Sequence, residues 1–332
     1  MDSHAVKSGV GLVVIGRNEG DRLRVCLAST ANLAEQSVYV DSGSTDGSVD
    51  LAIAMGVEVV KLDMSTPFTA ARARNAGFDR LLELAPSLEY VQFVDGDCEV
   101  INTWTERALE YLENHTDTAV VCGRRMERFP EYSIYNRLCD LEWDTPVGET
   151  KACGGDAMMR VSAYQQVNGF RDDLIAGEEP ELCVRFRQAD WKIFRLDEAM
   201  TLHDAAMTKF SQWWKRSQRA GYAFAEGASI HGRAPEKHWV AEARRGALWG
   251  GILPVAILLG MLVDSYALFI ALAYPTQTLR IYMKNIKMEK TKPHAFALAF
   301  FLVIGKFSEF SGQVKFYLRK TSNKSATLIE YK

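Results

Sequence analysis

Two aspartates separated by a single glycine, Asp95 and Asp97, follow a short apolar stretch at residues 90–94. Two carboxylates at this spacing can hold one divalent cation, because hard cations prefer oxygen ligands. Gly96 lets the backbone turn sharply between them. An acidic turn at the end of a strand has the same residue types, so the tripeptide alone leaves both interpretations open.

A second acidic group lies in the segment GEEPEL at residues 177–182. Its glutamates begin an expected helix, where the helix dipole favours negative charge. Capping accounts for one or two of the three, and we expect one to be placed for proton transfer. His203, in the segment TLHD, is a further candidate, although a single histidine is more often a structural residue.

Two loops, GRNEG at 16–20 and DSGSTDGS at 41–48, are rich in small, hydroxyl-bearing and acidic residues. Such loops suit a ribose and a base, and helix capping by Ser44 or Asp46 is the alternative. Arg72 and Arg74 could reach a phosphate or form surface ion pairs. The chain has neither a GK[ST] phosphate loop nor a GxGxxG fingerprint.

Strands and helices alternate through the first part of the chain. We expect strands at residues 10–15, 37–40, 57–62 and 90–94, and helices at 21–33, 49–55 and 67–78. This alternation predicts an α/β fold with a mostly parallel, doubly wound sheet. Right-handed crossovers place the loops after the strands along one edge, where such sheets bind ligands. Further on we expect helices at 103–114 and 132–143 and strands at 119–125 and 191–196.

Seven segments, in this order, resemble the family 2 glycosyltransferases, whose fold is the GT-A nucleotide-sugar-binding α/β sheet. They are GRNEG at 16–20, DSGSTDGS at 41–48, ARARNAGF at 71–78, DGD at 95–97, GGDAMMR at 154–160, GEEPELCVR at 177–185 and the histidine of TLHD. The resemblance covers residues 10–204. It implies a metal-dependent transferase with a nucleotide-sugar donor and a divalent cation, Mg²⁺ or Mn²⁺.

The resemblance also assigns roles to single residues. Asp95 and Asp97 match the pair that holds the cation on the donor diphosphate, and His203 matches a third metal or diphosphate contact. Asp41 matches the acid that accepts a hydrogen bond from the nucleotide base. The donor-binding positions are Arg17, Glu19, Asp41, Arg74, Asp95, Gly155 and Asp156.

Glu179 falls where the family usually has an aspartate that acts as the catalytic base. Its side chain is one methylene longer, which leaves the choice between Glu178 and Glu179 open. Ser42 stands where the family commonly has a second acid. Direct displacement of the diphosphate by an acceptor hydroxyl inverts the anomeric centre, so we expect an inverting transfer.

The composition of the chain bears on its partners and on its cellular compartment. The chain has 332 residues and a net charge of −3, which argues against a nucleic-acid-binding surface. Its six cysteines show no CxxC spacing and are expected to be reduced thiols of a cytosolic compartment. Residues 1–9 are polar and do not read as a signal peptide. We therefore expect the first domain to be cytoplasmic.

The last third of the chain has the composition of a membrane-associated region. Residues 208–227 form a candidate amphipathic helix with Trp213 and Trp214, typical of an interface or of ordinary packing. Residues 247–279 carry one charge, Asp264, and basic residues flank the run on both sides. A re-entrant hairpin around Asp264, with breaks at Pro254 and Pro275, keeps both basic clusters in the cytoplasm.

A second apolar run, at 296–305, has about half the length of a span, which takes about 20 residues. The basic tail after Lys315 is expected to lie on anionic lipid. An oligomerisation surface or a buried helical appendage is the alternative for this whole region.

Three regions result: a GT-A catalytic domain at 1–205, interface helices at 206–245 and an apolar helical, membrane-associated region at 246–332. We expect an inverting glycosyltransferase at the cytoplasmic face of the membrane, acting on a lipid-linked or growing polysaccharide acceptor. A catalytically silent nucleotide-sugar-binding or scaffolding subunit and a nucleotidyltransferase are the alternatives. The sequence does not indicate the oligomeric state.

Overall fold

The computed structural model describes residues 9–287 and 291–322. The chain forms two compact units. The sheet unit consists of Met1–Pro130 and Glu142–Ala206, and the helical unit consists of Glu131–Leu141 and Met207–Lys332. The last residues of the basic tail, 323–332, lie outside the described residues.

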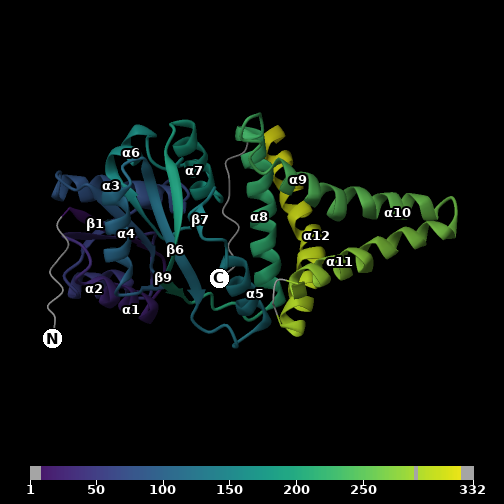
Figure 1. Ribbon diagram of the computed structural model, residues 1–332, viewed down its shortest axis with the longest axis horizontal. Coiled ribbons are helices and arrows are strands. Elements are labelled where there is room, and N and C mark those ends of the chain that lie inside the picture. The colour runs from purple at the N-terminus through teal and green to yellow at the C-terminus, as the bar shows by residue number, and fades with distance from the viewer. Residues whose placement is uncertain (1–8, 288–290, 323–332) are drawn as a thin grey trace. The chain divides into compact units, whose positions relative to one another are not determined.

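The sheet unit is built on a nine-stranded mixed sheet in the order β3-β2-β1-β4-β8-β6-β9-β5, with β7 beside β9 (Figure 1). Strands β1, β2, β3 and β4 pair in parallel, and β8 runs antiparallel between β4 and β6. The strands are β1 (Val10–Gly16), β2 (Gln36–Asp41), β3 (Glu58–Lys61), β4 (Tyr90–Asp95), β5 (Cys98–Val100), β6 (Thr118–Glu127), β7 (Gly148–Glu149), β8 (Ala157–Arg160) and β9 (Lys192–His203). The expected α/β fold with parallel strands is confirmed.

The strands at the centre of the sheet are apolar along nearly their whole length. All residues of β1 except the last are buried, as expected for a parallel strand with helices on both faces. The helices of this unit are α1 (Asp21–Thr30), α2 (Ser48–Ala54), α3 (Ala70–Leu84), α4 (Trp104–Asn114), α6 (Val161–Gln166) and α7 (Glu178–Gln188).

Helix α3 packs closely on the sheet because there is a glycine in β1 and another in the helix itself where the two meet. A Cβ atom on Gly77 would lie 2.4 Å from Cγ1 of Val13, and one on Gly11 would lie 2.4 Å from Cδ2 of Leu81. This packing holds the middle of α3 directly against β1.

Strand β9 extends beyond its expected range of 191–196. It continues to His203 through irregular register against β6, and its last three residues also pair antiparallel with β5, where Cys98 lies opposite His203. The short strands β5 and β7 and the helix α6 were not predicted, because two to six residues carry little periodicity.

The helical unit contains most of α5 (Ile134–Trp143) and a series of helices after residue 207. These are α8 (Phe210–His231), α9 (Val240–Ala247), the π-helical η1 (Leu248–Ile252), α10 (Leu253–Met261), the 3-10 segment η2 (Ser265–Leu272), α11 (Ala273–Lys287) and α12 (Lys292–Ser322). Helices α8 and α12 pack backbone against backbone, since a Cβ atom on Gly221 would lie 2.0 Å from the carbonyl oxygen of Glu309.

The apolar run folds as a helical hairpin, which we call the apolar hairpin (residues 248–287). The chain reverses at 262–264, where the Asp264 carboxylate accepts a hydrogen bond from the backbone N–H of Tyr266 at 2.9 Å. Pro254 and Pro275, the expected breaks, each lie where the helix type changes. Both lie in the first turn of a helix, directly after a π or 3-10 segment, where proline is tolerated.

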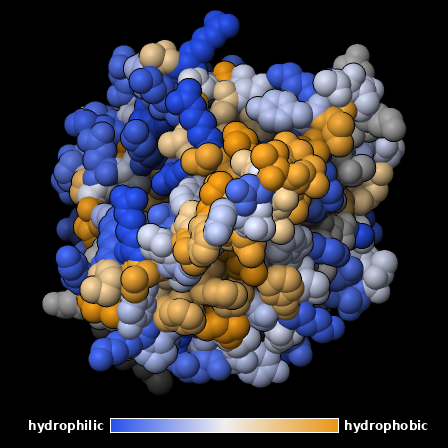
Figure 2. Space-filling model, turned by 90° about the vertical axis from the view of Figure 1, so that its right-hand side faces the viewer, coloured by the Kyte–Doolittle hydropathy of each residue, from blue (hydrophilic) through white to orange (hydrophobic). Residues whose placement is uncertain are grey.

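The apolar hairpin extends away from α8 and α12 in Figure 1 and exposes many large hydrophobic side chains. Figure 2, which looks onto its end, shows hydrophobic side chains gathered on this face. The most exposed are Ile252, Leu258, Leu259, Leu262, Val263, Tyr266, Phe269 and Leu279. Soluble monomers rarely expose an apolar patch of this kind.

The structure resolves two questions about the helical unit. Residues 296–305 are not a separate half-length run but part of the 31-residue helix α12. Within the described residues, α12 is the one helix long and apolar enough to cross a membrane by length and composition, although 39% of its most apolar window is buried. Trp213 is 3% exposed and packs on Phe301, so it belongs to the core of this unit.

Candidate active site

Asp95, the last residue of β4, is held by two arginines from different elements. Its Oδ1 pairs with Nη2 of Arg74 at 2.7 Å, and its Oδ2 pairs with Nη2 of Arg125, on β6, at 3.2 Å. Burial alone would raise the pKa of Asp95, but the charges of Arg74 and Arg125 hold it well below its usual range. Asp95 is therefore ionised at every physiological pH.

Asp156 supports this arrangement from the turn before β8. It is fully buried, and its Oδ1 accepts from the backbone N–H of Asp95 at 3.0 Å. Its Oδ2 accepts from Arg125 at 2.7 Å and from Thr201 Oγ1 at 2.9 Å. Protein donors thus occupy both oxygens, and the residue positions Asp95 and Arg125.

Gly155 lies directly against these charged groups. A Cβ atom there would lie 2.8 Å from Nη2 of Arg74 and 2.9 Å from Oδ2 of Asp95. Only a residue without a side chain leaves room for this ion pair, which explains the glycine at position 155.

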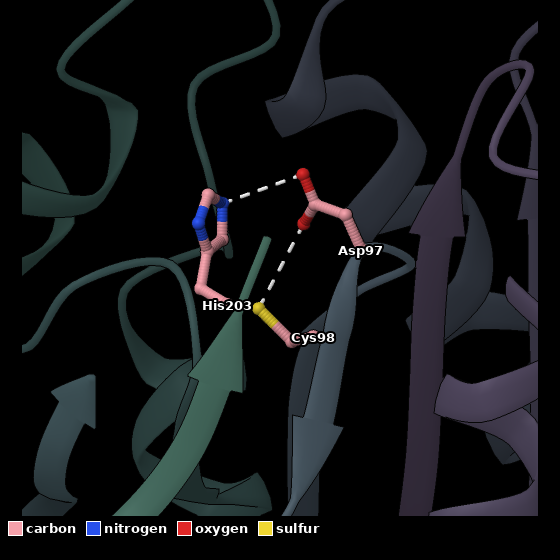
Figure 3. Close-up of side chains that lie close together, drawn as sticks. All are labelled: Asp97, Cys98 and His203. Carbon is pink, nitrogen blue, oxygen red and sulfur yellow. Dashed lines mark hydrogen bonds and ion pairs between the residues drawn. The ribbon is translucent and has the colours of Figure 1, made fainter. Parts of the chain in front are cut away.

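Asp97 and His203 form a second cluster beside Asp95 (Figure 3). Nε2 of His203 lies 3.3 Å from Oδ2 of Asp97, and both side chains are buried. Among the described residues, Nδ1 of His203 has no hydrogen-bond partner, and it lies 3.7 Å from Oε2 of Glu127. A neutral imidazole with its proton on Nδ1, facing that carboxylate, would have the lone pair of Nε2 free to bind a cation beside Asp97.

These atoms fit a hard divalent cation. Octahedral cations bind oxygen ligands at about 2.1 Å, which puts neighbouring ligand atoms about 3.0 Å apart. The Asp97 and His203 atoms are 3.3 Å apart and so are nearly in place. The sulfur of Cys98 lies close to the ligand atoms of Asp97 and His203. Burial and the charge of Asp156 raise the pKa of this thiol, however, and it donates a hydrogen bond to Asp156 Oδ2 at 3.2 Å.

The structure brings Glu178 and Glu179, the first two residues of α7, to the same region but gives them different partners. Glu178 Oε1 pairs with Nη1 of Arg74 at 3.0 Å, so Arg74 joins Glu178 to Asp95. Glu179 Oε1 accepts from the backbone N–H of Cys153 at 2.5 Å and from the thiol of Cys183 at 3.1 Å. Two donors on one oxygen fix the orientation of Glu179 and leave its other oxygen for a different proton donor.

The two loops of small residues lie at the ends of adjacent strands, since Gly16 pairs with Asp41 in the sheet. Asn18 joins the loops by accepting from the backbone N–H of Thr45 at 2.7 Å. Asp41 Oδ2 accepts from the backbone N–H groups of Gly43 and Ser44 at 3.0 and 2.9 Å, so this acid braces its own loop.

The remaining two residues of the expected donor site lie in the first loop. The guanidinium of Arg17 stacks on the ring of Phe68, 4.7 Å from its centroid. Glu19 pairs with Arg22 at 2.8 Å and lies beside Gly96, whose Cβ atom would be 3.4 Å from Glu19 Cγ. Both loops thus line the edge that carries Asp95.

Residues 12–169 match the sequence model of a known family, described as glycosyl transferase family 2. The matched residues, just under half of the chain, are thus similar to a family 2 glycosyltransferase domain. The chain is 24% identical over 275 residues to the succinoglycan biosynthesis protein ExoA of Rhizobium meliloti, an alignment that covers 77% of this chain and 79% of that protein. It is 22% identical over 225 residues to glycosyltransferase AglE of Haloferax volcanii, covering 64% and 71% of the two chains.

Solved structures extend the comparison to the fold. The mannosyltransferase PcManGT from Pyrobaculum calidifontis, in complex with GDP-Man and Mn²⁺, superimposes with a TM-score of 0.58 at 17% identity. The superposition covers 94% of this chain and 88% of that chain. The expected GT-A fold is confirmed.

Sequence reasoning missed two polar residues of the candidate site, Arg125 and Glu127. Both are on β6, which is otherwise buried and apolar in its first half. They are two residues apart and so point to one face of the strand, toward Asp95 and His203. Charged residues that alternate at the end of an apolar strand are the signal that could have identified them.

Proposed function

We propose that the protein transfers a sugar from a nucleotide-sugar donor to an acceptor hydroxyl, with inversion of the anomeric carbon and with Mg²⁺ or Mn²⁺ as cofactor. One observation carries this proposal: Arg74 pairs with both Asp95 and Glu178, which joins the proposed donor and acceptor sides in one network. The Mn²⁺ and GDP-Man of the mannosyltransferase with the same fold support the cofactor and the donor class.

On the donor side, Asp97 and His203 would hold the cation, and Asp95 is oriented next to them by its two arginines. When bound, the cation neutralises the charge that develops on the departing diphosphate. Asp41, Arg17 and Glu19 shape the loops that would receive the nucleoside. Arg74 fixes Asp95 and adds a positive charge close to the proposed diphosphate site.

On the acceptor side, Glu179 is the proposed base and Glu178 a positioning residue. A base must be oriented toward the hydroxyl whose proton it takes. The two hydrogen bonds to Oε1 provide this orientation, and Oε2 takes the proton as the hydroxyl attacks. Glu178, in contrast, is occupied by its ion pair with Arg74.

The acceptor is proposed to be lipid-linked or a growing polysaccharide, at the cytoplasmic face of a membrane. The exposed hydrophobic side chains of the apolar hairpin support a membrane-inserted segment. Arg280, Lys284 and Lys287 follow the hairpin's apolar part, and positive residues favour the cytoplasmic side. The similarity to a succinoglycan biosynthesis protein supports a polysaccharide product.

Screening nucleotide sugars for hydrolysis and transfer in the presence of Mn²⁺ tests the activity, and proton NMR of the fresh product reads its anomeric configuration. We expect turnover with one donor class and an inverted product. Donor binding without hydrolysis or transfer would instead support a silent nucleotide-sugar-binding subunit. A retained configuration would contradict direct displacement.

We predict that Glu179→Gln lowers kcat by about 100-fold or more, because the amide cannot accept the proton, while donor affinity stays near the wild-type value. Glu178→Gln is expected to weaken donor binding instead, because Arg74 loses a charged partner. Steady-state kinetics and calorimetric donor binding separate the two. Glu149→Gln, an exposed glutamate of β7, serves as the control. Full activity of Glu179→Gln removes this residue from the mechanism.

A further inference from the structure

Three side chains with metal-ligating atoms meet next to the proposed base, outside the Asp97–His203 cluster. Cys153, Cys183 and Glu179 are all buried, and their ligand atoms lie within 4.8 Å of one another. The two sulfur atoms are 3.7 Å apart, and the Cys183 sulfur is 3.1 Å from Oε1 of Glu179. We call these residues the thiol cluster.

We propose that the thiol cluster is a second metal site, one that binds Zn²⁺ and thereby blocks the base. Zn²⁺ binds thiolates at about 2.3 Å in tetrahedral sites, which puts the two sulfur atoms about 3.8 Å apart. The observed separation of the two sulfur atoms, 3.7 Å, is close to this distance. The third ligand is the Glu179 carboxylate, which leaves the fourth position for water.

The three ligands come from two backbone elements, the helix α7 and the turn that contains Cys153. Glu179 and Cys183 are four residues apart on α7, so they lie on the same face of one helix. Cys153 lies in the turn before Gly154, whose φ of 82° is a left-handed conformation that glycine adopts without strain. A small movement of this turn can therefore adjust the position of the Cys153 sulfur without disturbing the helix.

The chemistry of the ligands separates the thiol cluster from the proposed catalytic site. Two thiolates and one carboxylate select a borderline-soft cation such as Zn²⁺ over Mg²⁺ and Mn²⁺, which prefer the oxygen and imidazole ligands of Asp97 and His203. Burial raises the pKa of the Cys153 thiol and raises the pKa of Cys183 to about 11, so both thiols are protonated without metal. Binding of Zn²⁺ releases these two protons, and its affinity rises with pH.

The functional consequence rests on the proposed function of Glu179. A carboxylate that coordinates Zn²⁺ is a much weaker proton acceptor, because the cation stabilises its charged form. Occupation of the thiol cluster therefore inhibits transfer at a site that the catalytic cation does not share.

Titration with Co²⁺ tests the site itself, since cobalt bound to thiolate gives a charge-transfer absorption that the oxygen and nitrogen ligands of Asp97 and His203 do not. We expect one equivalent of such absorption in the full-length protein, its loss in Cys153→Ser and Cys183→Ser, and its displacement by Zn²⁺. Cys139→Ser, a buried cysteine of α5, is expected to titrate like wild type. Circular dichroism checks that each variant is folded, and Cys183→Ala serves as a second variant.

Absorption that survives in both cluster variants, or that disappears in Cys98→Ser instead, would overturn the proposed site. For the inhibition, we expect Zn²⁺ to lower transfer at least tenfold, with no relief by excess Mn²⁺. Cys183→Ser, compared with its own zinc-free rate, should lose most of this sensitivity. Relief by Mn²⁺ would place the inhibitory zinc at the Asp97–His203 cluster and contradict the inhibition. If the protein transfers no sugar but still gives the cobalt absorption, the proposed function is wrong and the proposed metal site is supported.

Discussion

Two arginines that are distant in the sequence keep the carboxylate of Asp95 ionised. Arg74 comes from α3 and Arg125 from β6, and each pairs with a different oxygen of this carboxylate. Asp156 then orients Arg125 and the Asp95 backbone at once. A carboxylate fixed in this way has a defined position before any ligand arrives.

The low pKa of Asp95 has a consequence for stability in acid. Because its pKa is lower in the folded than in the unfolded chain, its ion pairs stabilise the fold fully above the unfolded value of about 3.9. This stabilisation is lost as the pH falls through the folded value.

We therefore predict that Asp95→Asn is less stable than wild type at neutral pH and that the difference narrows below about pH 4. Denaturant unfolding of both proteins over this pH range measures the difference. If the difference in unfolding free energy between the two proteins stays constant below this pH, the charge of Asp95 does not stabilise the fold.

At the scale of elements, the sequence predicts the parallel part of the site well. The alternating strands and helices place residues 16–20 and 41–48 and Asp95 at one edge, and the sheet register agrees. The pairing of Asp97 with His203 is different. It depends on the antiparallel pairing of β5 with the end of β9, over 100 residues apart, and three-residue strands carry no pattern that reveals such a partner. The family resemblance, not periodicity, indicated His203.

The contact of α8 with α12 makes another prediction at this scale. A Cβ atom on Gly312 would lie 2.0 Å from the carbonyl oxygen of Gln218, and backbone cannot move aside as a side chain can. Gly312→Ala is expected to lower the free energy of unfolding by about 1–3 kcal/mol. Gly305→Ala, on the same helix, meets nothing closer than 3.5 Å and should be neutral or stabilising. Denaturant unfolding compares the two, and equal effects would contradict the close packing.

At the scale of the whole molecule, the chain combines a sheet unit with a buried polar site and a helical unit with an exposed apolar hairpin. The hairpin accommodates the apolar run at 247–279, which is longer than the about 20 residues that one upright span needs. A turn at residues 262–264 divides it into two short arms, and the side chains of that turn are among the most exposed in the described chain.

We predict that the double substitution Leu262→Asp and Val263→Asp weakens binding to lipid vesicles by at least tenfold, because two charges at the hairpin's tip oppose insertion. Leu262 and Val263 are 83% and 90% exposed, so the fold itself should tolerate the change. Ile53→Asp, at an exposed position of α2, is the matched control and should bind vesicles like wild type. Flotation with vesicles measures both, and unchanged binding of the double variant would exclude the hairpin as the membrane contact.

The proposed mechanism depends most on a divalent cation held between Asp97 and His203. Electron paramagnetic resonance of Mn²⁺, titrated with the protein and either UDP or GDP, measures this binding directly, because bound Mn²⁺ loses its sharp free-ion signal. We predict one tight Mn²⁺ site with one of the two nucleotides, and a loss of at least tenfold in affinity in Asp97→Asn and in His203→Ala. Wild-type Mn²⁺ affinity in both variants would contradict the central claim.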